Sequence, residues 1–298
     1  MSQVRRLQVL AALGDLGTFS AAAQELGITQ SAVSQHVAAL EREVDAVLVD
    51  RGSRPAQLTQ VGLRLAAAGR VVSTQLSTAE QEVLQLLGRQ QARLRVGSFP
   101  SALTTFVPQA LRRFRRARPE VDLSLVDSHM PRLLDLLDSG AIDVGVVYGT
   151  KGSLGPASDH VQLHHLCDDP YQVILPRGHR LAHRPALSLS ELAEERWIGS
   201  RSSATWFRIV VDACRAEGFT PSVALTTDDY LGVQAMVAST LGVAVVPRLA
   251  VRPSRQLVAL PISGRKVERR IWAVRTSHLP PSPLVEDLVT ALRRSASS

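Results

Sequence analysis

Apolar residues recur at helical spacing in three short stretches of the first sixty residues. The pattern predicts helices over residues 4–16, 21–26 and 30–43. Ser20 is the predicted N-cap of the second helix, because its hydroxyl can accept from a free backbone N–H. Gly27 is predicted to end that helix just past its C-cap. Two helices joined by a glycine-containing turn have helix-turn-helix spacing.

The third helix, which Thr29 or Gln30 opens, has two contrasting faces. Its apolar stripe comprises Ile28, Val33, Val37 and Leu40. Its predicted exposed face comprises Gln30, Ser31, Ser34, Gln35 and His36. Glutamine can pair bidentately with adenine, and serine reaches bases or phosphates. A solvated polar face has the same composition, so these residues alone favour neither interpretation.

Two short strand-like runs follow the third helix, over residues 47–49 and 56–58. They flank the segment Arg51-Gly-Ser-Arg54-Pro, so the pattern predicts a hairpin with two arginines at its tip. Arginine at such a tip suits a narrow minor groove or a phosphate. This wing favours DNA binding over a plain solvated face.

A single long helix is predicted next, with Thr59 as its N-cap and its end near Leu87. Apolar positions recur every three or four residues, at Val61, Leu65, Ala68, Val72, Leu76, Ala79, Val83 and Leu86. Such a helix spans roughly 40 Å and needs a partner of similar length to cover its stripe. A second copy of the chain would provide one; packing on its own C-terminal domain is the alternative. Residues 88–93 are polar and are predicted to form a hinge.

From Leu94 onward strands and helices alternate, which is typical of an α/β fold with parallel strands. Strands are predicted at 94–97, 121–126, 142–148, 171–175, 197–199, 223–226 and 243–246, and helices at 101–118, 131–139, 189–194, 204–217 and 229–239.

The net charge and its distribution along the chain do not change this interpretation. The 298 residues carry a formal net charge of +7 with 45% apolar residues, which excludes a mainly disordered chain. The first sixty residues hold five arginines and six acidic residues, so their balance is −1. The excess lies elsewhere, notably in the arginines at 112–118, which we interpret as a solvated face at a helix C-terminus rather than a DNA contact.

Few signs of other chemistry are present. The two cysteines, Cys167 and Cys214, favour a reducing compartment and show no sign of a redox pair. No phosphate-binding loop or nucleophile elbow is found, so neither a catalytic site nor a cofactor is predicted. The histidines at 160–165 and at 179–183 have spacings that allow a metal pair, but no carboxylate or cysteine accompanies them at ligand spacing, so no metal site is predicted. Asp15 closes the apolar start too early for a signal peptide, and the uncharged run 230–247 is broken by polar residues. We therefore expect a cytoplasmic protein with no membrane partner.

The stretch Phe19-Ser-Ala-Ala-Ala-Gln-Glu-Leu-Gly-Ile-Thr-Gln-Ser-Ala-Val-Ser-Gln-His-Val-Ala-Ala-Leu-Glu41 resembles the winged helix-turn-helix of LysR-type transcriptional regulators. Length and downstream order fit as well, so the resemblance covers essentially the whole chain. It departs at Val44-Asp45, where relatives usually have Leu-Gly, and at Val49, usually aromatic. Asp45 tolerates a left-handed turn. The missing aromatic could loosen the wing, whose tip is also poorer in glycine than in many relatives.

The resemblance implies a role for each residue of this head. Base-reading residues facing the major groove would be Gln30, Ser31, Ser34 and Gln35. Residues meeting backbone or minor groove would be Arg51 and Arg54, while caps with some phosphate contact would be Ser20 and Thr29. The implied partners are double-stranded DNA with an imperfect inverted repeat, a second copy in a homodimer or homotetramer, and RNA polymerase.

The resemblance also implies three parts. These are a winged helix-turn-helix at 1–58, a linker helix and hinge at 59–91, and a two-lobed, periplasmic-binding-protein-like α/β domain at 92–298. Lobe one would hold 92–161 and 268–298, and lobe two would hold 162–267. Two strands would cross between the lobes, near 160–166 and 267–274.

An effector site is expected between the lobes, because ligands sit at the carboxyl ends of strands in such sheets. The candidates follow predicted strands and open helices, where free N–H groups favour an anion. They are Ser98, Ser101, Ser200, Arg201, Ser202, Ser203 and Thr227. Plain N-capping is the alternative for each residue alone, and clustering favours a small anionic effector.

Two other functions remain as alternatives. A solute-binding or enzymatic two-lobed protein should carry a signal peptide or catalytic residues in its cleft. A DNA-architectural protein with a vestigial pocket should bind DNA without regard to any ligand.

Overall fold

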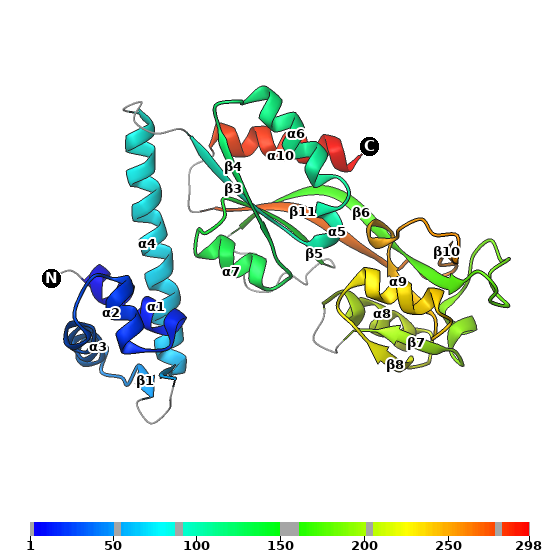
Figure 1. Cartoon of the computed structure of the whole chain (residues 1–298), viewed down its shortest axis with the longest axis horizontal. Helices are drawn as coiled ribbons and strands as arrows, with labels where there is room; N and C mark the ends of the chain where they lie inside the picture. Colours follow the sequence, from blue (N-terminus) through cyan, green and yellow to red (C-terminus); the bar gives the residue numbers. More distant parts are fainter. Residues whose placement is uncertain are drawn as a thin grey trace. The chain divides into compact units, whose positions relative to one another are not determined.

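The computed structural model describes residues 3–50, 55–86, 92–149, 161–200, 205–277 and 282–297 (Figure 1). The chain divides into two compact units. The first holds residues 1–95 with 120–123 and 135–143, and the second holds 96–119, 124–134 and 144–298. Among the described residues, no helix combines the length and the apolar character that crossing a membrane requires.

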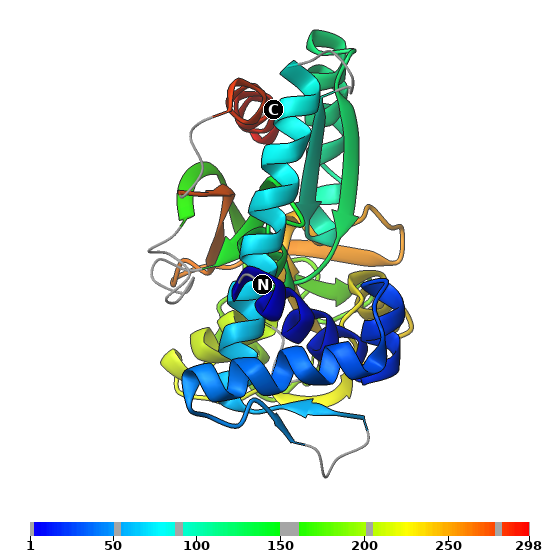
Figure 2. The same ribbon diagram turned by 90° about the vertical axis from the view of Figure 1, so that its left-hand side faces the viewer.

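The first unit begins with three helices, a hairpin and a long helix. Their bounds are α1 Gln3–Leu16, α2 Phe19–Glu25, α3 Gln30–Val44, β1 Val49–Asp50, β2 Gln57–Leu58 and α4 Gln60–Leu86. Figures 1 and 2 show α1 to α3 and the hairpin gathered around one end of α4. Their shared apolar core includes Leu10, Leu13, Val37, Leu40 and Leu48. This core is what fixes α3 against its neighbours, because burial of these side chains drives the packing.

Two helix ends in this unit test the local predictions. Helix α2 is capped by Thr18, whose hydroxyl accepts from the N–H of Ala21, so the prediction of Ser20 as the cap was wrong. Ser20 lies inside the helix with its side chain exposed. The other end follows the prediction: Gly27 has φ +63°, and the next N–H reaches back to the carbonyl of Ala23.

Helix α4 begins where the sequence predicts, because Thr59 accepts from the N–H of Gly62 and donates to the carbonyl of Val47. Its two glycines have a packing role. A Cβ at Gly62 would collide with the carbonyl oxygen of Leu48, and one at Gly69 would collide with that of Leu7. Glycine therefore lets α4 approach the hairpin and α1 at backbone distance, at the expense of helix propensity.

The rest of the chain is built on a seven-stranded sheet. Its strands are β3 Arg93–Ser98, β4 Asp122–Asp127, β5 Val144–Gly149, β6 Val161–Pro176, β9 Ala244–Pro247, β10 Leu257–Pro261 and β11 Glu268–Thr276. Their order is β10-β6-β11-β5-β3-β4, with β9 also paired to β6. A separate parallel pair joins β7 Arg196–Gly199 to β8 Ser222–Thr226. The helical segments are α5 Pro100–Leu103, α6 Val107–Ala117, α7 Arg132–Asp138, the 3-10 turns η2 Leu189–Leu192 and η3 Arg248–Ala250, α8 Thr205–Ala216, α9 Tyr230–Ala238 and α10 Pro283–Ala296.

The sheet is mixed rather than parallel throughout. Strands β3 and β5 are parallel as predicted, but β11 runs antiparallel to both β5 and β6. The strand predicted at 171–175 is the end of the 16-residue β6, which first pairs with β11 and then with β9 and β10. Figure 1 shows β6 and β11 together joining the two lobes of the α/β domain. Period-two patterning finds such strands but does not give their direction.

The helix predicted over 101–118 is two helices, α5 and α6. Pro108 lies in the first turn of α6, where its missing N–H costs nothing, but a continuous helix would need that donor. The hydroxyls of Thr104 and Thr105 donate to the carbonyl of Ser101, which completes the break. The break matters because it leaves Ser101 on a short turn of its own.

Candidate nucleic-acid interface and ligand cleft

Helix α3 presents an exposed, uncharged face. Thr29 caps it by accepting from the N–H of Ala32, 3.2 Å away. Gln30, Ser31 and Gln35 are exposed, and Ser34 is half-buried beside them. The opposite face, with Val33, Val37 and Leu40, is buried in the head. The two faces therefore divide as predicted, with one exception.

That exception is His36, which the sequence places on the exposed face. Its side chain is buried, with 9% of its surface accessible. Burial lowers the pKa of His36, and the positive charges of Arg5 and Arg6 lower this pKa further. Because the unprotonated ring is favoured, His36 belongs to the packing of the head rather than to its contact surface.

Three arginines of α1 and α4 are engaged within the head. Arg5 donates to the carbonyl of Leu26 at 3.2 Å, where α2 ends. Arg6 pairs with Glu43 at 2.6 Å, and Arg70 pairs with Asp15 at 2.7 Å. These ion pairs hold helices together, and the exposed side chains at the start of α3 are uncharged.

The wing is confirmed as a hairpin, with β1 antiparallel to β2 and Val49 opposite Leu58. Glu41 holds its base by accepting from the N–H of Leu48 at 2.9 Å. Asp45 adopts the left-handed conformation, with φ +50°, expected at this turn. The predicted contact residues Arg51 and Arg54 lie outside the described residues.

Part of the apolar stripe of α4 is uncovered in the single chain. Val61 and Leu76 are each 47% exposed, and Val83 is 54% exposed. The remaining described positions of the stripe are half-buried or exposed as well. An apolar row along a helix of 27 residues is typical of a surface that pairs with another helix.

In lobe one of the α/β domain, two of the predicted effector residues lie close together and are buried. Ser98 ends β3, and its hydroxyl has one long contact, 3.4 Å, with the carbonyl of Phe99. Ser101 lies in α5, and its hydroxyl accepts from Nη2 of Arg269 at 2.7 Å. Ser101 is therefore already partnered by a charged side chain that sequence reasoning did not single out.

In lobe two, the carboxyl ends of β7 and β8 bring Ser200 and Thr227 together. The N–H of Thr227 donates to the carbonyl of Gly199 at 3.0 Å, and the hydroxyl of Ser200 contacts the carboxylate of Asp228. Three further candidates, Arg201, Ser202 and Ser203, lie outside the described residues.

The proposed role of Thr227 at a helix N-terminus is wrong. Helix α9 is capped by Asp229, whose carboxylate accepts from the N–H groups of Leu231 and Gly232. Thr227 instead accepts from the N–H of Asp229. The free donors that would attract an anion there are already satisfied by a negative side chain, so the N-terminus of α9 does not favour a second negative charge.

A buried ion pair lies between these two groups. Arg269 on β11 and Asp169 on β6 are register partners, and neither side chain is exposed to solvent. Nε and Nη2 of Arg269 lie 2.9 and 2.8 Å from Oδ2 of Asp169. The other oxygen of Asp169 accepts from the N–H of Leu249 in η3. The pair thus connects both crossing strands to α5 and to η3.

Aromatic side chains surround the pair. The guanidinium of Arg269 lies 4.9 Å from the ring centre of Phe99 and 4.5 Å from that of Tyr148. The rings of Trp206 and Tyr230 lie 4.9 Å apart, and Tyr171 donates to the carbonyl of Trp206. Burial raises the pKa values of all three tyrosines, so their hydroxyls keep their protons.

Sequence reasoning missed this cluster, although one signal was present. Along β11 the buried positions alternate, and Arg269 falls on the same face as Ile271 and Ala273. A charged residue in phase with a buried apolar face indicates an interior charge that needs a partner. Asp169 gives the same signal on β6, where it falls in phase with the buried Tyr171 and Val173, but the pattern alone does not identify the strand beside it.

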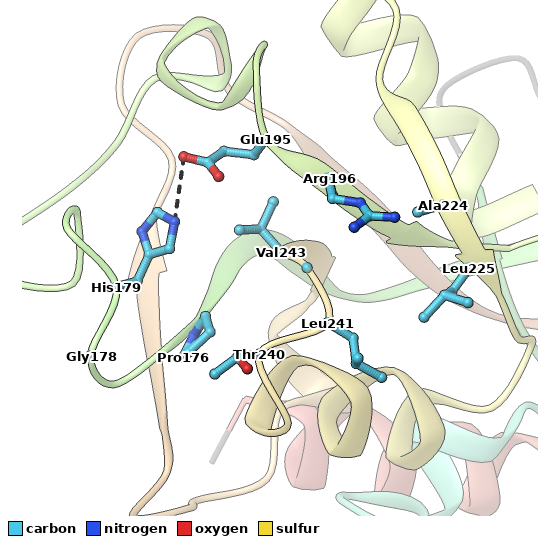
Figure 3. A pocket seen from close by; sticks show the side chains of 11 residues that line it. Pro176, Gly178, His179, Glu195, Arg196, Ala224, Leu225, Thr240, Leu241 and Val243 are labelled. Carbon is cyan, nitrogen blue, oxygen red and sulfur yellow. Dashed lines mark ion pairs between the residues drawn. The ribbon is translucent and has the colours of Figure 1, made fainter.

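A pocket of about 600 Å³ is present elsewhere in lobe two (Figure 3). His179 and Glu195 lie at one side, 3.4 Å apart, and Glu195 also pairs with Arg180. Because Nδ1 of His179 accepts from the N–H of Leu181, its proton lies on Nε2, toward Glu195. The pocket contains none of the predicted effector residues; among its charged side chains His179 and Glu195 pair with each other, and Arg196 also lines it.

The remaining candidate chemistry gains no support from the structure. Burial raises the pKa of Cys167 to about 11 and that of Cys214 to about 12, which is opposite to the low pKa of a reactive thiol. Among the described residues, no three metal-ligating side chains gather. In the arginine run of α6, Arg118 pairs with Asp287 on α10 at 2.8 Å, and the other four side chains are exposed.

Comparison with known proteins decides the family. Residues 87–297 match the model of the LysR substrate binding domain, and residues 4–63 match that of the lysR family of bacterial regulatory helix-turn-helix proteins. This chain belongs to the LysR family of transcriptional regulators. The LysR-type regulator is 32% identical over 296 residues to the probable transcriptional regulator LrrA of Synechococcus elongatus, covering 98% of this chain and 97% of the relative. It is 31% identical over 300 residues to the small neutral protease regulatory protein of Streptomyces coelicolor, covering 98% and 93%.

Solved structures agree on the fold. A full-length OxyR variant from Pseudomonas aeruginosa superposes with a TM-score of 0.70 at 21% identity, covering 98% of each chain. Full-length CbnR in complex with its target DNA superposes with a TM-score of 0.64 at 20% identity, covering 99% of this chain and 100% of that one. The LysR-type regulator therefore has a DNA-binding helix-turn-helix followed by a substrate-binding α/β domain, as the sequence predicted.

Proposed function

We propose that this LysR-type regulator is a cytoplasmic, effector-responsive transcription factor that reads an imperfect inverted repeat in double-stranded DNA. Gln30, Ser31, Ser34 and Gln35 contact base edges in the major groove. Arg51 and Arg54 contact phosphate or the minor groove, and Ser20 and Thr29 lie near phosphates. The single observation that carries this proposal is the uncharged polar face of α3, which is exposed while the other face is packed in the head.

An exposed neutral face favours sequence reading over general attraction to DNA. Glutamine offers a donor and an acceptor in one plane, which matches the edge of adenine, whereas a phosphate contact needs only positive charge. The nearby Arg5, Arg6 and Arg70 are occupied by protein partners. Affinity for a particular sequence would therefore rest on α3, and general affinity on the wing.

A second copy of the chain supplies the second reader. The exposed apolar row of α4 supports pairing of two such helices in a homodimer, with a homotetramer as its further assembly. Two heads on a symmetric pair read two half-sites of an inverted repeat. RNA polymerase is the partner through which such a DNA-bound regulator acts on transcription.

The effector is proposed to bind between the lobes and to be small and anionic. Buried Ser98 and Ser101 from lobe one, Ser200 and Thr227 from lobe two, and Arg201, Ser202 and Ser203 form the candidate set. The buried guanidinium beside Ser101 supports the anionic character better than the N-terminus of α9 does, because Asp229 already occupies that N-terminus. A ligand that prefers one arrangement of the lobes would shift the population of that arrangement.

The decisive experiment begins with genome-wide mapping of the DNA that the purified protein binds, followed by footprinting of the strongest site. In the double variant Gln30→Ala/Ser34→Ala we expect that protection to be lost, since each base-reading contact is worth about 1–3 kcal/mol. The salt dependence of the remaining nonspecific binding should not change, because no charge is removed.

Gln256→Ala is the matched control, since Gln256 is an exposed glutamine in lobe two. It should leave the footprint unchanged. If the double variant protects the same sequence at the strength of the unaltered protein, α3 is not the reader and the proposal is wrong.

A further inference from the structure

Arg269 has donors that the described residues do not use. A guanidinium carries five N–H groups, one on Nε and two on each terminal nitrogen. Nε and Nη2 of Arg269 reach Asp169 and Ser101. Nη1 is buried and has no hydrogen-bond partner among the described residues.

The surrounding rings do not satisfy this nitrogen. Phe99 and Tyr148 lie near the guanidinium, 4.9 and 4.5 Å from their ring centres to its central carbon. Such contacts stabilise the cation through the ring faces. The two N–H groups of Nη1 lie in the guanidinium plane and still require an acceptor, since an unpaired buried donor is costly.

Two more unpaired polar atoms belong to the same aromatic cluster. The hydroxyl of Tyr230 and Nε1 of Trp206 are both buried without a hydrogen-bond partner in the described part of the chain. Their rings pack against each other, and Tyr230 lies close enough to Arg269 to act on its pKa. Three orphaned donors from β11, α8 and α9 in one region indicate a missing acceptor.

We propose that this missing acceptor is the carboxylate of the effector, held by Nη1 of Arg269 and the hydroxyl of Tyr230, with Trp206 as a third donor. The inference rests on the proposed function and names the chemical class of its ligand: a small monocarboxylate with an apolar body. Arg269 thus replaces the predicted helix N-termini as the source of positive charge.

The charge balance limits the ligand to one negative charge at most. Arg269 and Asp169 together are neutral, so a phosphate dianion would leave two negative charges without compensation in a buried site and a monocarboxylate only one. A carboxylate has two coplanar oxygens, which can accept from the two N–H groups of Nη1 and from the hydroxyl of Tyr230. The rings of Phe99, Tyr148, Trp206 and Tyr230 offer apolar contact to the rest of the molecule.

Ligand binding at Arg269 would also be connected to both lobes. Its ion-pair partner Asp169 accepts from Leu249 in η3, and Arg269 itself donates to Ser101 in α5. Arg252, just beyond η3, reaches the carbonyl of Thr104 at 3.4 Å. A carboxylate that reorients Arg269 therefore acts on contacts in both lobes at once.

The test uses the full-length protein, thermal unfolding and titration calorimetry, with benzoate and phenylacetate as probes. Benzamide and inorganic phosphate serve as comparators. We expect the carboxylates to raise the melting temperature where benzamide and phosphate do not. Tyr230→Phe should weaken carboxylate binding at least about tenfold, as expected for the loss of a hydrogen bond to a charged group.

Tyr171→Phe is the matched control. Its hydroxyl has a partner, the carbonyl of Trp206 at 3.0 Å, so its removal should lower the melting temperature without changing the shift caused by the carboxylates. Tyr230→Phe removes an unpaired hydroxyl and should not lower the melting temperature of the free protein. The two variants thus separate a loss of stability from a loss of binding.

The charge-free pair Arg269→Met/Asp169→Leu should fold and should not respond to either carboxylate. The inference is overturned if no carboxylate stabilises the unaltered protein, which would leave water as the acceptor, or if binding survives in both Tyr230→Phe and the charge-free pair. Footprinting of the same preparations tests the DNA-binding function separately from the ligand site. If the mapped DNA is still protected, the proposed function is supported even when the carboxylate site is not.

Discussion

The DNA-binding head and the α/β domain treat a buried titratable group in opposite ways. In the head, His36 is surrounded by apolar packing and by two arginines that lower its pKa, so the neutral ring is favoured. In the α/β domain, Arg269 and Asp169 are buried completely and face each other. Burial raises the pKa of Asp169, and the guanidinium opposes that effect. The head thus favours a neutral form of its buried histidine, whereas the α/β domain holds a buried positive charge that a buried negative charge compensates.

The contrast follows from what each region contacts. The polar face of α3 in the head is exposed, so water can satisfy its polar groups, and the core can remain apolar. The interior of the α/β domain is closed to bulk solvent at Arg269, so only protein, a ligand or a trapped water can satisfy the guanidinium. A buried charge with a free donor is thus a ligand candidate, whereas an exposed polar face is a candidate only when its position on the helix supports it.

Removal of one charge from the buried pair should have the largest effect. Asp169→Ala leaves Arg269 buried without its counter-ion, and we expect the free energy of unfolding to fall by about 3–5 kcal/mol. Denaturant unfolding of the full-length protein, followed by Trp206 and Trp197 fluorescence, measures this loss, since both tryptophans are buried in the α/β domain.

Asp169→Leu combined with Arg269→Met is the control for that prediction. Removing both charges should recover most of the lost stability, because no uncompensated charge remains. If Asp169→Ala lowers the free energy of unfolding by less than about 1 kcal/mol, the buried pair contributes no more to stability than an exposed salt bridge does.

A smaller effect is expected in the head, where packing rather than charge is decisive. Gly62→Ala should gain up to about 1 kcal/mol from helix propensity, yet its Cβ collides with the carbonyl of Leu48. We expect net destabilisation of about 1–3 kcal/mol, as for an overpacked core. Thermal unfolding followed by circular dichroism shows whether Gly62→Ala is less stable than the unaltered protein. Helix propensity alone predicts the opposite, a more stable protein.

Gly178→Ala, in lobe two of the α/β domain, is the control for Gly62→Ala. No atom lies within 4 Å of a Cβ placed there, so the substitution should be close to neutral. A stabilised Gly62→Ala protein would show that α4 does not pack on the hairpin at backbone distance.

The smallest effect is the pH dependence of the head. Because the pKa of His36 is lower in the folded protein than the ordinary value of 6.5, the unfolded chain binds more protons between the two values. The contribution of His36 to stability is therefore full above pH 6.5 and declines as the pH falls toward the lowered pKa. Unfolding midpoints between pH 5 and 8 should show this decline in the unaltered protein.

His36→Gln should flatten that profile, since glutamine does not titrate. His183→Gln, which alters an exposed histidine in lobe two, should leave it unchanged. An identical slope in His36→Gln would assign the pH dependence to other groups.

Much of the head could be predicted from its sequence. Thr29, Thr59 and Gly27 act within one helical turn, and the apolar stripe of α3 repeats at a period that any amphipathic helix shares. These interactions join residues three to six positions apart, so a local pattern contains all that they require. The burial of His36 was missed because it depends on the packing of α1 against α3, which the α3 pattern does not describe.

The α/β class of the C-terminal domain was predicted from the sequence, but the buried ion pair of Arg269 and Asp169 was not. Alternating strands and helices, and the placement of Ser98 and Ser101 where a strand gives way to a helix, follow from local patterns. The direction of β11, the continuation of β6 and the division of α5 from α6 depend on neighbours far along the chain. The predicted effector residues were chosen as helix-opening groups, and Asp229 displaced one of them.

The sequence by itself determined the helix-turn-helix, the long helix, the α/β class and the uncharged exposed face of α3, because each is a matter of spacing within a few turns or one strand. Tertiary structure alone decided that Arg269 meets Asp169, one hundred positions away, and that one edge of its guanidinium stays unpaired. The physical reason is that strand register is set by the packing of whole elements, whereas a cap or a stripe is set by the next few residues.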